Sequence, residues 1–296
     1  MLIGVYLRLF GRPGGEQEPP NWTSIREAAM AAEVAGFDRV VLEDVLLYPG
    51  ADGNDGVWDP ISMAAAIAAS TSRIGIAHAV LNNPYRHPAI TARTAATLDE
   101  VSGGRYSLGI GLGNTPNDYP RFGIAADRRY SRFAESIQII SGLLRTGHAR
   151  FEGEFHSVLD GELVLRGPRA NGPPIIVAAG KPKMLRLAAR YADEWNWWAD
   201  DPTNPDAMRD LLGELTRACE EVSRDPASLA RSIDLFSFGP PEPPGTASAP
   251  AIADQILAWE SLGFGEARIN VRVPVGMSVS EAVAAMAEVV ALVHGG

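Results

Sequence analysis

The chain has 296 residues, of which 46% are hydrophobic, and a formal net charge of -10 at pH 7. This length allows two ordinary domains or one large α/β barrel, and the negative charge disfavours a nucleic-acid partner, whose phosphates need a basic protein face. No segment has the roughly 18 consecutive apolar residues of a membrane helix, the first residues do not form a signal peptide, and the single cysteine, Cys219, has no disulfide partner, so we expect a cytoplasmic protein.

Eight short runs rich in apolar and β-branched residues predict strands, and a segment with helical periodicity follows each of them. Several helical segments have recognisable starts: Asp59 and His87 each precede a proline, and Ser278 with Glu281 is typical of a capping box. Regular alternation favours a closed barrel over an open sheet, so we expect one (β/α)8 TIM-barrel domain over residues 1–296. The expected strands are 2–7, 39–44, 74–81, 106–112, 175–179, 194–198, 232–238 and 267–273.

Long connections follow several of the expected strands, at 8–22, 45–58, 113–127 and 239–248, whereas most connections leading into strands are short. This asymmetry predicts a functional site at the carboxyl ends of the strands. Residues 147–174 interrupt the repeat before the strand at 175–179. Their glycines and alternating apolar residues predict a hairpin insertion.

The run GIGLGN at 109–114 closes one expected strand but lacks the third glycine of a dinucleotide-binding motif. Two interpretations are open. The glycines let a flat ring approach the backbone, which we favour, or they permit tight packing of small residues in the core.

The segment VAAGKPKML at 177–185 contains the only two lysines of the chain, Lys181 and Lys183. Gly180 permits a sharp turn, and Pro182 at the first helical position has no N–H, so we expect the amides of Lys183 and Met184 to point outward at the positive end of a helix. This pattern predicts a site for a phosphate monoester. The alternative is that both lysines extend into solvent.

The sequence lacks the residues that other barrel chemistries require. No lysine lies in an expected strand, which disfavours Schiff-base chemistry, and the five histidines form no ligand pair, so we expect no metal site. A retaining glycosidase needs two carboxylates that face each other. Glu43 and Asp44 end one strand, but we place Asp234 near the start of its own strand, which leaves this possibility weak.

Five longer segments together carry a family resemblance, and the combination of PYRHP, LDEVSGGR and LAARYADEWN within them is highly specific. The chain resembles the bacterial luciferase-like flavin oxidoreductases, (β/α)8 proteins that use FMN or the deazaflavin coenzyme F420. The segments are AAEVAGFDRVVLED (31–44), DPISMAAAIAASTSRIGI (59–76), NPYRHPAITARTAATLDEVSGGRYSLGIGLG (83–113), DRRYSRFAESIQII (127–140) and PPIIVAAGKPKMLRLAARYADEWN (173–196).

The resemblance implies a layout for the cofactor. Its ring would lie across the barrel mouth above a non-prolyl cis peptide, which falls by register on Ala79 and Val80. The residues implied to line the cofactor are Gly111, Gly113 and Asn114, with Gly180, Lys181, Lys183 and Met184 around its phosphate. Asn196, near the end of the strand at 194–198, is a further candidate to face the cofactor.

One departure from the family pattern affects the acid–base group. Many members have Asp-His at the end of the second strand, whereas this chain has Glu43, Asp44 and Val45. Asp44 and Glu43 are therefore the nearest catalytic candidates, and His78 is a third. The alternatives are loop carboxylates with a capping role and a core histidine held by hydrogen bonds.

The function expected from the resemblance is two-electron redox chemistry on a small organic substrate. A luciferase-like monooxygenase, which uses reduced FMN from a separate flavin reductase together with oxygen, is the first expectation. An F420-dependent hydride-transfer oxidoreductase is the alternative, and a non-catalytic flavin-binding protein is a further one. Relatives are often homodimers. Arginines available for the acidic tail of F420 are Arg8, Arg12, Arg86, Arg121, Arg128 and Arg129.

Overall fold

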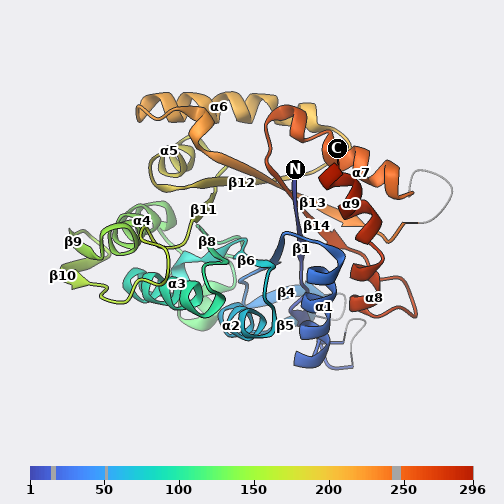
Figure 1. Ribbon diagram of the computed structural model, residues 1–296. Helices are drawn as coiled ribbons and strands as arrows, with labels where there is room; N and C mark the ends of the chain where they lie inside the picture. The colour runs from blue at the N-terminus through green and yellow to red at the C-terminus, as the bar shows by residue number, and fades with distance from the viewer. Residues whose placement is uncertain (15–17, 51–52, 242–247, 296) are drawn as a thin grey trace.

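A closed barrel of eight parallel strands forms the centre of the computed structural model, which describes residues 1–14, 18–50, 53–241 and 248–295 (Figure 1). Seven neighbouring pairs run in the order β11-β12-β13-β14-β1-β3-β6-β8, and parallel pairing of β8 with β11 closes the ring. All eight predicted strands and the TIM-barrel fold are confirmed. The strands are β1 (Leu2–Tyr6), β3 (Arg39–Leu42), β6 (Gly75–His78), β8 (Tyr106–Gly111), β11 (Ile175–Ala178), β12 (Glu194–Ala199), β13 (Ala230–Phe238) and β14 (Glu266–Val271).

Helices surround the barrel, one or two after each strand (Figure 1). Their ends follow the expected capping chemistry: the side chains of Asp59 and His87 accept hydrogen bonds from the first-turn amides, and Ser278 with Glu281 forms a capping box. The helices are α1 (Trp22–Ala35), α2 (Pro60–Ser70), α3 (Pro88–Ser102), α4 (Arg129–Thr146), α5 (Pro182–Tyr191), α6 (Arg209–Glu221), α7 (Ala249–Leu257), α8 (Val279–Ala284) and α9 (Ala287–Gly295).

The amino-terminal half of the barrel interior contains a buried charge network rather than apolar side chains alone. Arg39, Glu194 and Glu266 each stand at the first residue of a strand, and the fully buried Arg268 lies one layer above them. Arg268 pairs with Glu194 and Glu266, and Arg39 pairs with the same two carboxylates. Two cations and two anions therefore balance in this layer, which joins β3, β12 and β14 across the barrel.

The long loops after β1 and β3 form a small antiparallel sheet at the carboxyl ends of the strands. It consists of β2 (Phe10–Gly11), β5 (Gly53–Val57) and β4 (Leu47–Gly50), and the ring of Tyr48 stacks on Phe10 at a centroid distance of 4.2 Å. Residues 242–247, within the long connection 239–248, lie outside the described part of the chain.

The insertion at 147–174 contains the predicted hairpin, formed by β9 (His148–Glu152) and β10 (Ser157–Glu162). Glu135 on α4 accepts hydrogen bonds from the backbone amides of Glu154, Phe155 and His156, which fixes the turn of the hairpin to the barrel. Within the described residues, no helix is both long and apolar enough to span a membrane.

Candidate active site

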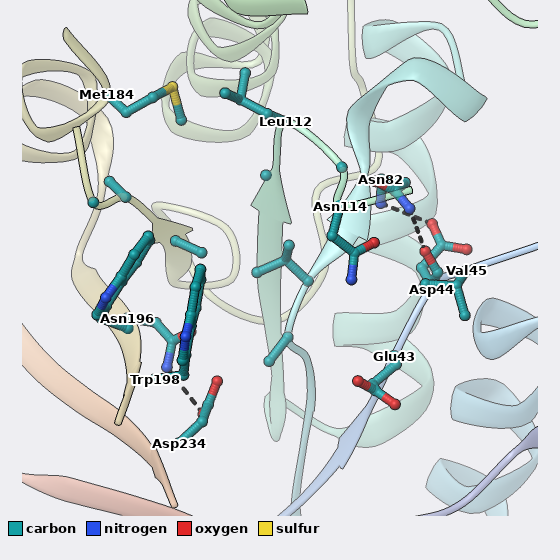
Figure 2. Close-up of a pocket in the computed structure, with 18 of the residues that line it drawn as sticks. Glu43, Asp44, Val45, Asn82, Leu112, Asn114, Met184, Asn196, Trp198 and Asp234 are labelled. Atoms are coloured by element: carbon teal, nitrogen blue, oxygen red, sulfur yellow. Dashed lines mark hydrogen bonds between the residues drawn. The ribbon is translucent and has the colours of Figure 1, made fainter. Parts of the chain in front are cut away.

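A cavity of about 730 Å³ opens at the carboxyl ends of the barrel strands (Figure 2). Its volume suits an organic cofactor together with a small molecule. The lining includes most residues predicted for the site: Glu43, Asp44, Ala79, Val80, Gly111, Gly113, Asn114, Gly180, Lys181, Met184 and Asn196. His78 and Lys183 are the two predicted residues that do not line it.

The turn from β11 into α5 brings one lysine, not two, to the cavity. Lys181 is the N-cap of α5 and lines the cavity, whereas the ammonium of Lys183 lies 5.6 Å from the ring centroid of Tyr130. The expectation for the Met184 amide also needs correction, because this amide donates to the carbonyl of Lys181 at 2.9 Å. A second cation, Arg129 at the start of α4, lines the cavity and donates to the carbonyl of Gly113. Lys181 and Arg129 are hereafter the cationic end of the cavity.

The glycines at the end of β8 and just after it pack tightly against neighbouring side chains, as in the second of the two interpretations drawn from the sequence. A Cβ on Gly113 would lie 1.7 Å from the Tyr119 hydroxyl, and one on Gly111 would lie 2.7 Å from a methyl group of Val80. Gly113 also has a φ of 85°, which disfavours any side chain. Gly111 and Gly113 also line the cavity, so the approach of a flat ring to this backbone stays a prediction.

The peptide bond between Ala79 and Val80 is cis, as the resemblance implied. Both residues line the cavity at the end of β6. Asn114, in the loop after β8, also points toward the cavity interior (Figure 2).

Asp44 lines the cavity, but its carboxylate is already engaged (Figure 2). The guanidinium of Arg86 donates to both carboxylate oxygens, at 2.5 and 3.2 Å, and the backbone amide of Asn82 donates at 2.9 Å. An ion pair with two hydrogen bonds fixes the position of a carboxylate. Asp44 therefore holds the loop after β6 through Asn82 and Arg86. This role matches the alternative of a loop carboxylate with a capping role.

Glu43, directly after β3, and Asp234, on β13, present two carboxyl groups to the cavity, and they are hereafter the acidic pair (Figure 2). Burial, together with the charge of Asp234, raises the pKa of Glu43 to about 7. Burial also raises the pKa of Asp234 to about 6, although Arg268 and hydrogen bonds from Asn196 and Tyr6 partly oppose it. The placement of Asp234 near the start of its strand was wrong, because β13 begins at Ala230 and Asp234 lies at its middle.

His78 is a core residue and does not reach the cavity. It is fully buried, with Nδ1 2.8 Å from the Tyr106 hydroxyl and Nε2 3.2 Å from the carbonyl of Pro60. Because a carbonyl only accepts, Nε2 carries the hydrogen and Nδ1 accepts from Tyr106. Burial lowers the pKa of His78 to about 4, so the ring is neutral at physiological pH. These contacts match the alternative of a hydrogen-bonded core histidine.

The end of β12 supplies one amide and an aromatic wall. Asn196 donates to Ser232 at 3.2 Å and to Asp234 at 3.1 Å, so it fixes the aspartate of the acidic pair. Trp197 and Trp198 stack at a centroid distance of 3.8 Å, and both line the cavity. A Cβ on Gly180 would lie 2.1 Å from the indole of Trp197, so the position of this indole requires glycine at the β11–α5 turn.

These features define a class of protein. The chain is a (β/α)8 barrel whose active-site face holds one cofactor-sized cavity in the described residues, with a cationic end, an acidic pair and an aromatic wall.

The comparisons with known proteins give the family. A family model described as luciferase-like monooxygenase matches residues 1–239, and the chain belongs to this family. Pyrimidine monooxygenase RutA of Escherichia coli strain K12 is 31% identical over 244 residues, which are 77% of this chain and 62% of RutA. An uncharacterised protein of Mycobacterium tuberculosis (strain ATCC 25618 / H37Rv) is 29% identical over 84% of this chain and 85% of its own length.

Solved structures share the fold. An F420-dependent secondary alcohol dehydrogenase in complex with an F420-acetone adduct aligns with a TM-score of 0.82, covering 99% of this chain and 98% of its own, at 17% identity. EDTA monooxygenase from Chelativorans sp. BNC1 aligns with a TM-score of 0.81, covering 100% of this chain and 93% of its own, at 16% identity. The protein is an oxidoreductase of a family that works with reduced FMN or with F420.

Proposed function

We propose that this oxidoreductase is a monooxygenase that uses reduced FMN and oxygen on a small organic substrate. The preference for a monooxygenase rests on RutA, the relative with 31% identity. The observation that carries the proposed cofactor site is the cationic end of the cavity, where the ammonium group of Lys181 makes no hydrogen bond or ion pair within the described residues.

The donors present fit the phosphate of FMN. Lys181 lines the cavity at the start of α5, where the positive end of the helix dipole adds to its charge. Arg129 stands at the start of α4 and shares its guanidinium with the Gly113 carbonyl, so part of its donor set is still available. These residues would hold the phosphate. The acidic pair lines the same cavity, and its carboxyl groups would repel a phosphate. The phosphate would therefore bind at the cationic end.

When bound, reduced FMN supplies two electrons for the reaction of oxygen with the substrate. The chain's own part is binding, orientation and exclusion of water. Ala79, Val80 and Leu112 line the cavity with apolar surface, and Trp197 and Trp198 add aromatic surface. These walls keep water from the reacting atoms once the ligands are in place.

Equilibrium binding of FMN and F420, each oxidised and reduced, tests the proposal. We expect reduced FMN to bind, and oxygen uptake to depend on an added flavin reductase and a substrate. Binding of F420 in preference to FMN would instead favour the hydride-transfer alternative. Failure of both cofactors to bind would contradict a cofactor site in this cavity. Reconstitution of the activity with an added flavin reductase tests the proposed partner. Sedimentation of the same protein preparation tests whether it is a homodimer.

A further inference from the structure

Two charged side chains in the cavity have no hydrogen bond or ion pair within the described residues, and they have opposite charge. One is Lys181, at the cationic end, and the other is Glu43. The remaining acids of the cavity are engaged, Asp44 by Arg86 and Asp234 by Asn196. Glu43 is therefore the carboxyl group of the cavity that is available to a bound molecule.

The surroundings of Glu43 come from several strands and are mostly acidic or weakly acidic. Asp234 on β13 faces it across the cavity, and Tyr48 on β4 and Tyr6 on β1 interact with it electrostatically (Figure 2). Arg268 on β14 is the cation beside Asp234: its Nη1 lies 4.0 Å from Asp234, and its other nitrogens are held by Glu194 and Glu266. The positive charge thus reaches Asp234, while Glu43 is left without a cation.

We propose that Glu43 is the proton acceptor of the reaction and that its substrate presents an O–H or N–H donor to it, with Asp234, which faces Glu43 across the cavity, as the positioning residue. This inference rests on the proposed function of the same cavity. The step is a proton transfer alone. The O–H or N–H bond of the substrate breaks, its electron pair stays on that oxygen or nitrogen, and the proton is bound by a carboxylate oxygen of Glu43.

The acidic pair also restricts the substrate class. A carboxylate placed beside Glu43 and Asp234 would add a third negative group to a buried site, which is unfavourable in a low-dielectric environment. A hydroxyl or amine is favoured there, because it donates a hydrogen bond to a carboxylate. The substrate is therefore an alcohol or an amine at the position that meets Glu43.

The raised pKa of Glu43, about 7, supports this role, because a base with a pKa near the working pH accepts and releases protons readily. Asp234 contributes to that shift, so removing its charge should lower the pKa of Glu43.

The first test is a ¹³C NMR titration of glutamate side-chain carboxyls in the cofactor-free protein. In the wild-type protein we expect one carboxyl signal with a midpoint near pH 7, absent in Glu43→Gln and retained in the control Glu162→Gln, whose side chain is exposed on the β9–β10 hairpin. Asp234→Asn should move the midpoint down by about one pH unit. Circular dichroism verifies that each variant is folded. A Glu43 midpoint below pH 5, or one that Asp234→Asn leaves in place, overturns the proposal.

The second test uses three compounds of one shape: benzyl alcohol, benzylamine and benzoate. Each is added to the protein with its cofactor, and the Glu43 carboxyl signal and the fluorescence of the tryptophan wall are recorded. We expect the alcohol or the amine to shift the Glu43 signal in the wild-type protein and to bind at least tenfold more weakly to Glu43→Gln, with benzoate weakest throughout. Equal responses to all three compounds, including no response, contradict the substrate class. Because the first test needs no cofactor, failure of FMN binding and failure of the Glu43 role are distinguishable.

Discussion

Lys181 and Lys183 are two positions apart, yet they face different surroundings. Lys181 lines the cavity as the N-cap of α5, and the ammonium of Lys183 lies over the ring of Tyr130 on α4. We expect Lys181→Ala to weaken cofactor binding by about 1.5 to 3 kcal/mol, the usual range for one charge-assisted hydrogen bond, and Lys183→Ala to leave affinity nearly unchanged. Calorimetric titration of both variants checks this. Equal losses of cofactor affinity would mean that neither lysine contacts the phosphate directly and that both act only through their positive charge.

Glu43 should lower stability at alkaline pH. Its pKa rises from an ordinary value of 4.5 to about 7 in the folded protein, because burial disfavours the charged form. Between those two pH values the folded state binds more protons than the unfolded state, so stability falls as pH rises. We expect Glu43→Gln to have a higher Tm than the wild type at pH 8, with the difference shrinking toward pH 5. Scanning calorimetry at both pH values measures it, and a difference independent of pH would contradict the shifted pKa.

The sequence located most of the cavity because its residues lie at strand ends, which apolar periodicity predicts well. What it could not supply is the direction of individual side chains. Asp234 was placed outside the mouth because the start of β13 was drawn two residues late, at Ser232 instead of Ala230. Likewise, the burial of His78 depends on Tyr106 and Pro60, which are distant in sequence and meet it only in the folded barrel.

At the scale of elements, the β11–α5 turn and the end of β12 are coupled through Gly180 and Trp197. A methyl group at Gly180 would overlap the indole, whose nearest atom lies 2.1 Å from the Cβ position. Gly180→Ala should therefore destabilise the protein by about 1 to 3 kcal/mol and weaken cofactor binding, because the aromatic wall and the β11–α5 turn both shift. Urea denaturation measures the first effect and titration with cofactor the second.

Gly213 on α6 provides the matched control for that substitution. A Cβ there has no neighbour within 4 Å, and the residue lies inside a helix. Gly213→Ala should stabilise the protein by about 0.5 to 1 kcal/mol, since alanine loses less backbone entropy in a helix, and should leave cofactor affinity as it is. Equal destabilisation by both alanines would show that the clash with Trp197 is relieved without cost.

Elements with a strong local signal were predicted, and elements that depend on contacts between loops were not. The eight strands and the β9–β10 hairpin follow from alternating apolar residues and turn glycines. The sheet of β2, β4 and β5 joins two loops separated by α1 and β3, and its strands contain glycine and polar residues such as GNDGV. Such strands show no alternation of apolar and polar residues in the sequence. They pair because the barrel brings the two loops side by side.

At the scale of the whole molecule, the buried network of Arg39, Glu194, Glu266 and Arg268 links β3, β12 and β14 beneath the cavity. Burial by itself would raise the pKa of Glu194, but Arg268 and Arg39 outweigh it and hold that pKa below its ordinary value. The network therefore works as a charged unit, and its value to stability depends on the balance between its two cations and two anions.

Replacing one charged residue of this network should destabilise the protein more than replacing one cation and one anion together. Arg268→Met leaves Glu194 and Glu266 to Arg39 alone and also removes the cation beside Asp234, which we expect to destabilise the protein by about 3 to 5 kcal/mol. Glu194→Gln combined with Arg268→Met restores the balance, because Arg39 then pairs with Glu266. The double variant should be more stable than the sum of the single effects predicts, by about 1 to 3 kcal/mol. Urea denaturation of the wild type, the two single variants and the double variant measures the four free energies of unfolding. Strictly additive losses would mean that the charges of this layer act independently and that the barrel is held by strand pairing and apolar packing.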